Sequence, residues 1–314
     1  MNNIDRSGIL FCVSSYLVWG LVPLVFKYVA AVPDLEVLAH RVLWALVIMV
    51  PWIWWRRNRG HLREIFTDKK KVLGLVATSI LVSSNWFIFI YAVAIGKTLE
   101  SSFGYFISPL MIILFGVIFL GERLGKLQLL SVVLALTGVA YQMIQLGELP
   151  LIALTLATTW AIYGLARKKI QVEAIEGLFV EVVVLAPLAL AYMAYHNAND
   201  GLAFFSMGLG TSLMLIVAGI VTILPLWLFT EGNKRIPMSV NGFLQYITPT
   251  MHFGCAVLAF GEELNSHKLI SFMFVWAGLG VILFGPYLNR RREAVTQNWK
   301  AALQKRKTPK KTAM

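Results

Sequence analysis

Charged residues are scarce in this 314-residue sequence. Asp, Glu, Lys and Arg together make up 14% of it, against about a quarter in a typical soluble domain. Hydrophobic residues make up 58%, and the few charges cluster between long apolar runs. The length would suit two soluble domains, but so little charge leaves no polar surface for them. The composition therefore predicts a membrane protein with several spans.

Cysteine is almost absent, and no enzyme signature occurs. The two cysteines, Cys12 and Cys255, lie in apolar segments, which excludes a disulfide framework and a cysteine metal site. Gly96-Lys97-Thr98 resembles the end of a phosphate-binding loop, but Tyr91 stands where that loop requires glycine. His-Glu-x-x-His and the nucleophile elbow are also missing. We expect no enzyme, no cofactor and no metal. Because the chain has no nucleotide-binding site, any transport by such a membrane protein would have to be driven by a gradient or by exchange.

The net charge of +12 is the one feature that would suit a nucleic-acid partner. Its distribution argues against such a partner, because nine of the 28 Lys and Arg residues lie at 290–292 and 300–311. Most of the others lie in short loops between apolar runs. The sequence therefore predicts a lipid bilayer and no nucleic acid as its surroundings.

Ten apolar segments follow one another, each near the roughly 20 residues that a bilayer core requires. They predict an all-α membrane protein with ten transmembrane helices. The expected helices lie at residues 8–29, 34–55, 72–95, 99–120, 127–145, 149–166, 175–195, 210–230, 238–260 and 267–287.

One stretch of the chain occurs twice, 140 residues apart. The shift aligns Ile107 with Ile247, Pro109 with Pro249, Gly121 with Gly261, Glu122 with Glu262, Leu124 with Leu264 and Gly138 with Gly278. A self-match with a period near half the chain predicts a duplicated domain and not a solenoid. We expect a first five-helix repeat at 1–145, a second at 146–290, and a basic cytoplasmic tail at 291–314.

Lys and Arg concentrate in alternate loops. The basic loops are those at 56–71, 121–126, 167–174 and 231–237, while those at 30–36, 146–148 and 196–209 are poor in Lys and Arg. Basic loops stay in the cytoplasm, so both termini are predicted to be cytoplasmic. Because each half has an odd number of helices, the halves must be inverted. Inverted repeats are typical of alternating-access transporters, whose binding site lies between the halves.

Polar side chains inside the membrane need a cavity, a partner or a function. In the segment 238–260, one helix face carries Asn241, Gln245, Thr248 and His252, and Ser101, Tyr105 and Ser108 occupy the equivalent face of 99–120. Two symmetry-related stripes favour a central pathway, and hydrogen bonding between helices is the alternative. Tyr105 and Gln245 are the preferred substrate contacts.

Two prolines and one arginine add to this picture. Pro109 and Pro249 each remove a backbone donor in mid-helix, which predicts kinks and free carbonyl groups. Arg41 is expected about 10 Å inside the second span, counted at 1.5 Å per residue from residue 34. Arg41 either pairs with an acidic residue (Asp34, Glu36 or Glu100) or faces the cavity and attracts an anionic group.

Aromatic residues supply candidate walls for a pocket. Asn85 and Trp86, with Trp19, Tyr16, Trp160 and Tyr246, would form a weakly polar aromatic lining, and ordinary packing is the alternative. His252 and Glu181 are candidates for proton coupling, because a dry site can bring either group to titrate near neutral pH. The alternative for Glu181 is contact with cytoplasmic water.

Motifs in both halves resemble one family. They are Leu38–Trp44, Asn85-Trp86, Leu99–Leu110, Gly121–Arg123, Tyr163–Lys169 and Phe243–Thr250. Over residues 8–290 these resemble the RarD proteins, EamA-type transporters of the drug/metabolite transporter superfamily. The resemblance implies ten helices in two inverted halves, a central cavity, and the bacterial cytoplasmic (inner) membrane. It does not name the cargo, since relatives move many kinds of compound.

The sequence thus predicts a secondary transporter, an exporter of a small organic metabolite or drug-like compound that works by alternating access. One alternative is a passive facilitator or channel for small solutes. Another is a membrane scaffold whose basic tail binds anionic lipid or a partner. Small residues such as Gly138 and Gly278 would also permit the close packing of a homodimer.

Overall fold

The computed structural model describes residues 5–55, 59–95, 97–147, 149–199, 201–261, 266–267, 269–282 and 284. The basic tail expected at 291–314 lies outside these ranges, as do Glu262 and Leu264 of the repeat. The described elements are α1 (Arg6–Tyr28), α2 (Asp34–Trp55), α3 (Arg59–Thr67), α4 (Lys69–Ala94), α5 (Thr98–Leu120), α6 (Lys126–Leu146), α7 (Leu151–Lys169), α8 (Ala174–Asn199), α9 (Ala203–Ser206), α10 (Leu209–Arg235), α11 (Met238–Gln245), α12 (Ile247–Gly254), the π-helical turn η1 (Cys255–Ala259) and the helix Leu269–Ile282.

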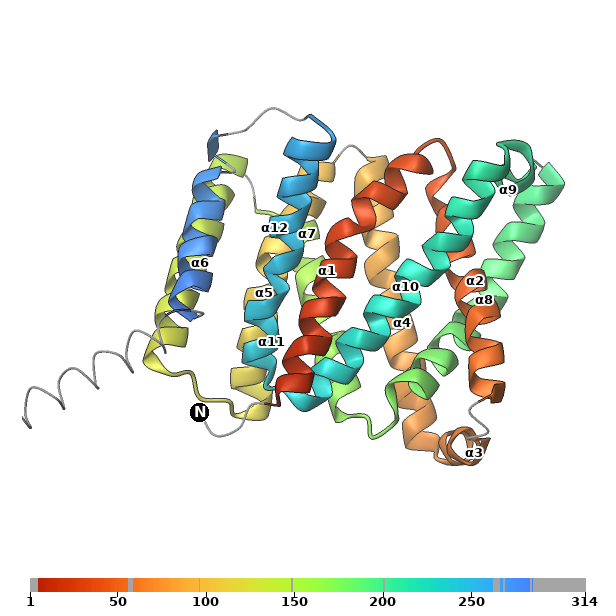
Figure 1. Cartoon of the computed structure of the whole chain (residues 1–314), viewed down its shortest axis with the longest axis horizontal. Helices are drawn as coiled ribbons and strands as arrows, with labels where there is room; N and C mark the ends of the chain where they lie inside the picture. The colour runs from red at the N-terminus through yellow and green to blue at the C-terminus, as the bar shows by residue number, and fades with distance from the viewer. Residues whose placement is uncertain are drawn as a thin grey trace, which may run out of the picture.

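The long helices stand side by side, with α3 crossing the lower edge of the bundle (Figure 1). Among the described residues, seven helices are long and apolar enough to cross a membrane, namely α1, α2, α4, α5, α6, α8 and α10. Each coincides with an apolar segment expected from the sequence. α7 covers the segment expected at 149–166, and the shorter helix Leu269–Ile282 lies inside that expected at 267–287.

The span expected at 238–260 is not one continuous helix. α11 ends at Gln245 and α12 begins at Ile247, and the chain then continues into η1. The interruption follows from Pro249, which has no N–H and whose ring crowds the carbonyl four residues earlier, that of Gln245. The symmetric Pro109 lies inside α5, which continues through it to Leu120. The two prolines therefore act on their helices differently.

Two short helices occupy loops in which the sequence predicted no helix. α3 lies between α2 and α4, and α9 lies between α8 and α10. A shift of 140 residues carries the range of α3 over that of α9, so they are counterparts in the two halves. Leu62 and Ile65 of α3 pack against Leu75 of α4 and Val172, which holds this helix against the bundle end.

Helices of the two halves interlock with matching contacts. The same shift carries α1 onto α7, α2 onto α8, and α4 onto α10. α1 packs along α10, and their counterparts α7 and α4 pack together in the same way. α5 packs against its own counterpart, α11, where Gly242 lets the backbones approach: a Cβ there would lie 2.6 Å from the carbonyl oxygen of Pro109. The duplication read from the sequence is thus visible in the packing.

The glycines considered for a homodimer are used within the chain. A Cβ on Gly138 of α6 would lie 2.8 Å from the carbonyl oxygen of Ser271, and one on Gly278 would lie 3.0 Å from that of Ser131. The Ser131 hydroxyl also donates to the Gly278 carbonyl at 2.8 Å. These reciprocal contacts join α6 to the helix Leu269–Ile282. They explain the small residues without a second chain.

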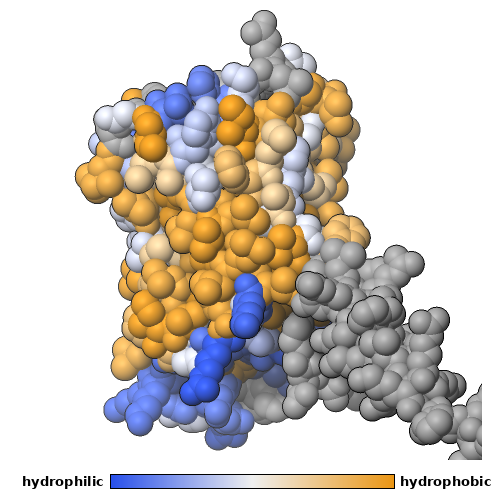
Figure 2. Space-filling view, turned by 90° about the vertical axis from the view of Figure 1, so that its left-hand side faces the viewer, coloured by the Kyte–Doolittle hydropathy of each residue, from blue (hydrophilic) through white to orange (hydrophobic). Residues whose placement is uncertain are grey.

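The outer surface carries an apolar band. Figure 2 shows this band on the face that includes α6, with hydrophilic side chains above and below it. Leu129, Val133 and Leu136 of α6 are exposed there. Outward-facing apolar side chains on spanning helices are what a bilayer requires. At the lower end, Asp5 caps α1 by accepting the N–H of Ser7 at 2.8 Å, and the hydrogen bonds from Ser7 lower the pKa of its carboxyl group.

Candidate functional site

A cavity of about 240 Å³ lies between the two halves. Its walls come from α1, α2, α4, α5, α7, α10, α11 and α12. The lining reaches Val29, Ala30 and Asp34 around the α1–α2 connection, where Ala30 and Asp34 are exposed. This connection lies at the end of the bundle opposite the N-terminus (Figure 1).

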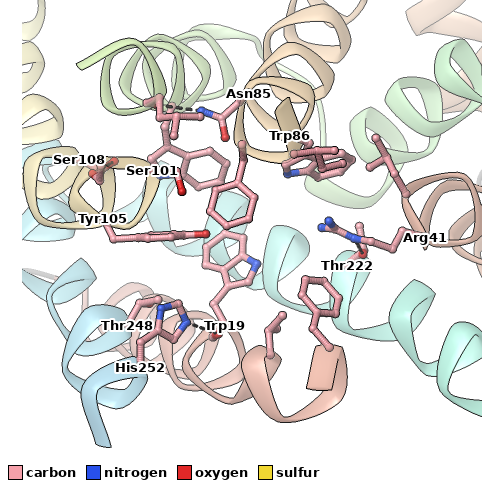
Figure 3. A pocket seen from close by; sticks show the side chains of 18 of the residues that line it. Trp19, Arg41, Asn85, Trp86, Ser101, Tyr105, Ser108, Thr222, Thr248 and His252 are labelled. Atoms are coloured by element: carbon pink, nitrogen blue, oxygen red, sulfur yellow. Dashed lines mark hydrogen bonds between the residues drawn. The ribbon is translucent and has the colours of Figure 1, made fainter. Parts of the chain in front are cut away.

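Arg41 of α2 points into this cavity (Figure 3). Its Nε donates to the hydroxyl of Thr222 at 2.9 Å, and its guanidinium carbon lies 4.5 Å from the ring centre of Trp86. Within the described ranges, no carboxylate lies at ion-pair distance from Arg41. Glu36 instead lies near His40 and His196, and Glu100 pairs with Lys97 at 3.2 Å. Of the two alternatives for Arg41, the structure has the one in which it faces the cavity.

Thr222 is a cavity residue that the sequence did not single out. It is the only polar side chain between Leu213 and Leu226, which was the available signal. Its hydroxyl donates to the Ala218 carbonyl at 2.7 Å, so its lone pairs are left to accept from Arg41. Phe26 and Phe89 were also missed, because aromatic side chains are common in membrane helices and carry no mark of a cavity.

Asn85 and Trp86 both line the cavity from α4. The Asn85 amide donates to the Leu156 carbonyl and to the Thr159 hydroxyl, each at 2.8 Å (Figure 3). These bonds tie α4 to α7 and use both amide hydrogens. Only the Asn85 carbonyl oxygen is then left to accept from a ligand. Trp86 presents its ring face to Arg41.

The two polar stripes expected from the repeat both border the cavity. Its lining includes Ser101, Tyr105 and Ser108 from α5 and Gln245, Thr248 and His252 from α11 and α12. Tyr105 and His252 meet edge to face with ring centres 5.2 Å apart, and His252 Nε2 lies 3.1 Å from the Trp19 carbonyl oxygen, to which it can donate. The Oε1 atom of Gln245 is buried and has no hydrogen-bond partner among the described residues.

Trp19 and Trp160, the matching tryptophans of the two halves, also line the cavity and touch each other. Their ring centres are 5.3 Å apart in an edge-to-face arrangement. The indole N–H of Trp160 is buried and has no partner in the described part of the chain. Asn241 of the expected stripe does not reach the cavity, because the Tyr16 hydroxyl donates to it at 2.7 Å.

Three other residues singled out from the sequence lie outside the cavity lining. Tyr246 is buried in a cluster with Phe106 and Phe272, and its hydroxyl donates to the Phe106 carbonyl at 3.3 Å. Tyr246 therefore does not form a wall of the cavity. Pro109 and Pro249 are also absent from the lining. The carbonyl group of Pro109 meets Gly242 at the α5–α11 contact instead.

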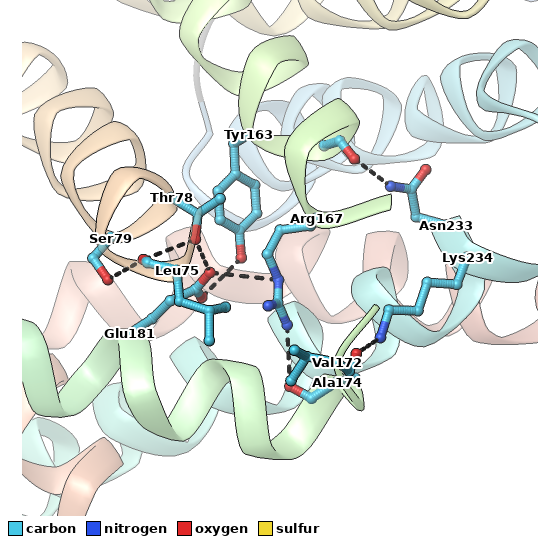
Figure 4. A network of polar contacts seen from close by, with 11 residues as sticks. Leu75, Thr78, Ser79, Tyr163, Arg167, Val172, Ala174, Glu181, Asn233 and Lys234 are labelled. Carbon is cyan, nitrogen blue, oxygen red and sulfur yellow. Dashed lines mark hydrogen bonds and ion pairs between the residues drawn. The ribbon is translucent and has the colours of Figure 1, made fainter. Parts of the chain in front are cut away.

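Glu181 does not line this cavity either, and it is only 2% exposed, so it does not reach bulk water. Its carboxylate accepts from the hydroxyls of Thr78 and Tyr163 and lies 3.4 Å from the Nε of Arg167 (Figure 4). Arg167 is fully buried and also donates to the Ala174 carbonyl at 3.2 Å. Glu181 is thus the charge partner of a buried arginine that joins α7 to α8.

Polar contacts close the bundle at the end near the N-terminus. The carboxylate of Glu122, in the α5–α6 connection, accepts the first N–H groups of α11, from Met238 at 2.7 Å and Ser239 at 2.8 Å. Lys168 of α7 donates to the carbonyls of Asn233 and Ile236. The Glu122 bonds join the first half to the second. The cavity therefore ends before this side of the molecule.

The lining suits a small organic molecule better than a metal. Within the described ranges, no three His, Cys, Asp or Glu side chains gather as ligands would. The cavity combines one arginine, one histidine, one aspartate at its mouth, a few amide and hydroxyl groups, and several aromatic rings. Such a mixture of apolar walls and few polar groups is typical of sites for small organic ligands.

Comparison with known proteins identifies relatives along nearly the whole chain. A model of the EamA-like transporter family matches residues 6–143 and 149–284. Protein RarD of Escherichia coli (strain K12) is 40% identical over 288 residues, which cover 91% of this chain and 97% of that protein. An uncharacterized transporter of Vibrio cholerae is 42% identical over 277 residues, covering 87% of this chain and 91% of its own.

A more distant relative and a solved structure extend the comparison. The chloramphenicol-sensitive protein RarD of Pseudomonas aeruginosa is 30% identical over 286 residues, covering 90% of this chain and 94% of that protein. A solved crystal structure matches with a TM-score of 0.71 at 19% identity, covering 88% of this chain and 98% of the other. At that identity, the solved structure supports the fold alone.

Proposed function

Because this chain belongs to the EamA-like transporter family, we propose that it is a secondary transporter that exports a small organic metabolite or drug-like compound by alternating access. The family makes it a multi-pass membrane transporter and not an enzyme, and the resemblance to RarD proteins is confirmed. The cargo, its direction and the mechanism are the proposal. The observation that carries it is a cavity between two related halves that reaches the α1–α2 connection at one end, while Glu122 joins the halves at the other.

The proposed topology is ten helices in two inverted halves, with both termini in the cytoplasm of a bacterium and the helices in its cytoplasmic membrane. Counterpart helices such as α1 and α7 are five spans apart, so they run in opposite directions. Basic residues lie at the bundle end that holds the N-terminus, on α3 and at the ends of α4, α6, α7 and α10. The positive-inside rule then assigns this end to the cytoplasm.

With this orientation, the cavity faces outward. Its lining reaches the α1–α2 connection, on the side away from the basic end. Glu122 holds the cytoplasmic side closed through hydrogen bonds that cross from the first half to the second, and Lys168 adds bonds within the second half. Export requires a second state in which the Glu122 bonds break and the outer helix ends come together. The inverted repeat supplies such a state, because each half can adopt the packing of the other.

A transport assay with one cavity variant tests this function. Purified protein in proteoliposomes is assayed for uptake of candidate compounds, with and without a proton gradient. Gln245→Ala should abolish transport, because it removes a buried amide from the cavity wall, while the melting temperature stays near that of the parent. Gln142→Ala on α6 is the matched control, since Gln142 is outside the lining.

The outcomes separate the candidate functions. Unchanged transport by Gln245→Ala would contradict the assignment of the cavity. Uptake that never exceeds equilibrium under any imposed gradient would indicate a passive facilitator. Transport of no compound, together with a phenotype that depends only on residues 291–314, would indicate a scaffold.

A further inference from the structure

We propose that the cavity selects small organic anions in which a carboxylate is attached to an aromatic or apolar body and no ammonium group lies beside it. The inference rests on the proposed transport function and deepens it by naming the class of substrate. Three features carry it. The first is the part-buried guanidinium of Arg41, which has no carboxylate partner among the described residues. The others are the aromatic walls beside it and the distance that separates it from Asp34, the acidic residue of the described lining.

The charge of Arg41 is not neutralised by any described carboxylate. A charged side chain deep between membrane helices is costly unless it is paired. The fully buried Arg167 follows that rule, since Glu181 lies 3.4 Å from its Nε. Arg41 has no carboxylate at that range among the described residues and instead borders the cavity. A bound anion would supply the missing partner.

The guanidinium is held so that its forked end is free. Thr222 accepts from Nε at 2.9 Å. The guanidinium carbon lies 4.5 Å from the ring centre of Trp86 and 5.5 Å from that of Phe26. The two Nη groups donate to no other described residue and point into the cavity (Figure 3). A planar fork of N–H donors matches the two oxygens of a carboxylate in a bidentate pair.

The rest of the cavity suits an apolar body. Trp19, Trp86, Trp160 and Phe89 present ring surfaces to it, and the Tyr105 hydroxyl makes no hydrogen bond to another described residue. Burial of a ring against such walls is favourable because it removes apolar surface from water. A volume of about 240 Å³ leaves room for one ring with a short chain.

A substrate ammonium group finds no carboxylate next to Arg41 in the described lining. Asp34 is the only carboxylate in that lining, and it is exposed at the cavity mouth. Asp34 lies seven positions before Arg41 on α2, which is about 10 Å along a helix. An α-amino acid carries its ammonium on the carbon beside the carboxylate, so that charge would lie close to the guanidinium and be repelled. A simple carboxylate avoids this repulsion.

The test compares four ligands that share one skeleton. Isothermal titration calorimetry of the purified full chain in detergent measures binding of 3-phenylpropionate, 3-phenylpropionamide, phenylalanine and phenethylamine, with inorganic phosphate as a competitor. We expect 3-phenylpropionate to bind at least tenfold more tightly than each of the others, and phosphate not to displace it at comparable concentration.

Variants assign the selectivity to the guanidinium. Arg41→Gln should weaken binding of 3-phenylpropionate at least tenfold without changing binding of 3-phenylpropionamide. Arg41→Lys should have an intermediate effect, because it keeps the charge and loses the forked pair of donors. Thr222→Val removes the hydroxyl that accepts from Arg41 Nε but keeps the charge of Arg41 and the fold. It should weaken binding of 3-phenylpropionate three- to tenfold. Arg63→Gln, an exposed residue of α3, is the matched control and should bind like the parent.

Several results would overturn the inference. Equal binding of the acid and the amide, tighter binding of phenylalanine, or binding unaffected by Arg41→Gln in a folded variant would each do so. Displacement by phosphate at similar concentration would make this a site for small inorganic anions, and no binding of any ligand would also contradict it. Arg41-dependent binding without uptake into proteoliposomes would leave this inference standing and contradict the transport function.

Discussion

Replacing Glu181 by Gln should destabilise the protein, because it leaves a buried arginine without its counter-charge. Arg167 is fully buried, and its only ion-pair partner among the described residues is Glu181. Its Nη1 atom already lacks a hydrogen-bond partner in the described chain.

The expected cost follows from the removal of one member of a buried ion pair. Such a removal costs about 3–5 kcal/mol. At about 2–4 °C per kcal/mol, the apparent melting temperature should fall by roughly 6–20 °C. Replacing both residues with apolar ones, as in Arg167→Met/Glu181→Leu, should recover most of this loss, because neither charge is then left buried and unpaired.

The assay combines thermal unfolding in detergent with transport per folded molecule in proteoliposomes. Glu231→Gln is the control, since Glu231 pairs with Arg235 at 2.8 Å near the surface, where an ion pair contributes little. If Glu181→Gln kept the parental melting temperature but lost the response of transport to a proton gradient, Glu181 would be the proton-coupling residue considered from the sequence. Its structural role as the counter-charge of Arg167 would then be refuted.

Two further predictions concern the contacts between the halves. Glu122→Ala removes the acceptor of the Met238 and Ser239 N–H groups. Hydrogen exchange at these two amides, measured by mass spectrometry, should become about tenfold faster, as a loss of about 1.4 kcal/mol implies. Unchanged exchange would show that Glu122 does not hold the closed end. Gly138→Leu would place a side chain against the Ser271 carbonyl and should cost about 1–3 kcal/mol of stability by thermal unfolding. A change in oligomeric mass without loss of stability would instead favour an interface between chains.

The arrangement of the helices could be predicted from the sequence because two signals reinforce each other. Apolar length located the long helices, and the 140-residue self-match showed which of them are counterparts. The break at Tyr246 was less accessible, since Pro249 and Pro109 occupy equivalent positions and only one interrupts its helix. The local rule for proline states that a hydrogen bond is lost. Tertiary contacts decide whether the helix bends, breaks or continues.

The cavity was partly predictable from helical spacing. Ser101, Tyr105 and Ser108 fall on one face of α5 and do line it. Tyr246 follows Gln245 directly, which turns it about 100° around a helix and toward another cluster. Spacing therefore argued against Tyr246 as a wall of the same cavity.

Partner choice for the buried charges was not predictable. Arg41 and Glu181 were both recognisable as charges inside the membrane. Arg41 could have paired with an acid, but it meets Thr222 and Trp86 across the chain. Glu181 is paired with Arg167, which sequence reading had counted only among loop charges. Such pairings depend on which helices lie side by side, and no periodicity along one helix contains that information.

The most direct test of alternating access is the side from which the cavity can be reached. A single cysteine at Ser108, in protein lacking Cys12 and Cys255, is treated with a membrane-impermeant maleimide from each side of oriented vesicles. We expect labelling from the outer side in the parent, and a gain of labelling from the cytoplasmic side, with a matching loss from the outside, when Glu122→Gln weakens the closed end. Simultaneous access from both sides would indicate a channel, and access from the cytoplasmic side alone would contradict the outward-facing assignment.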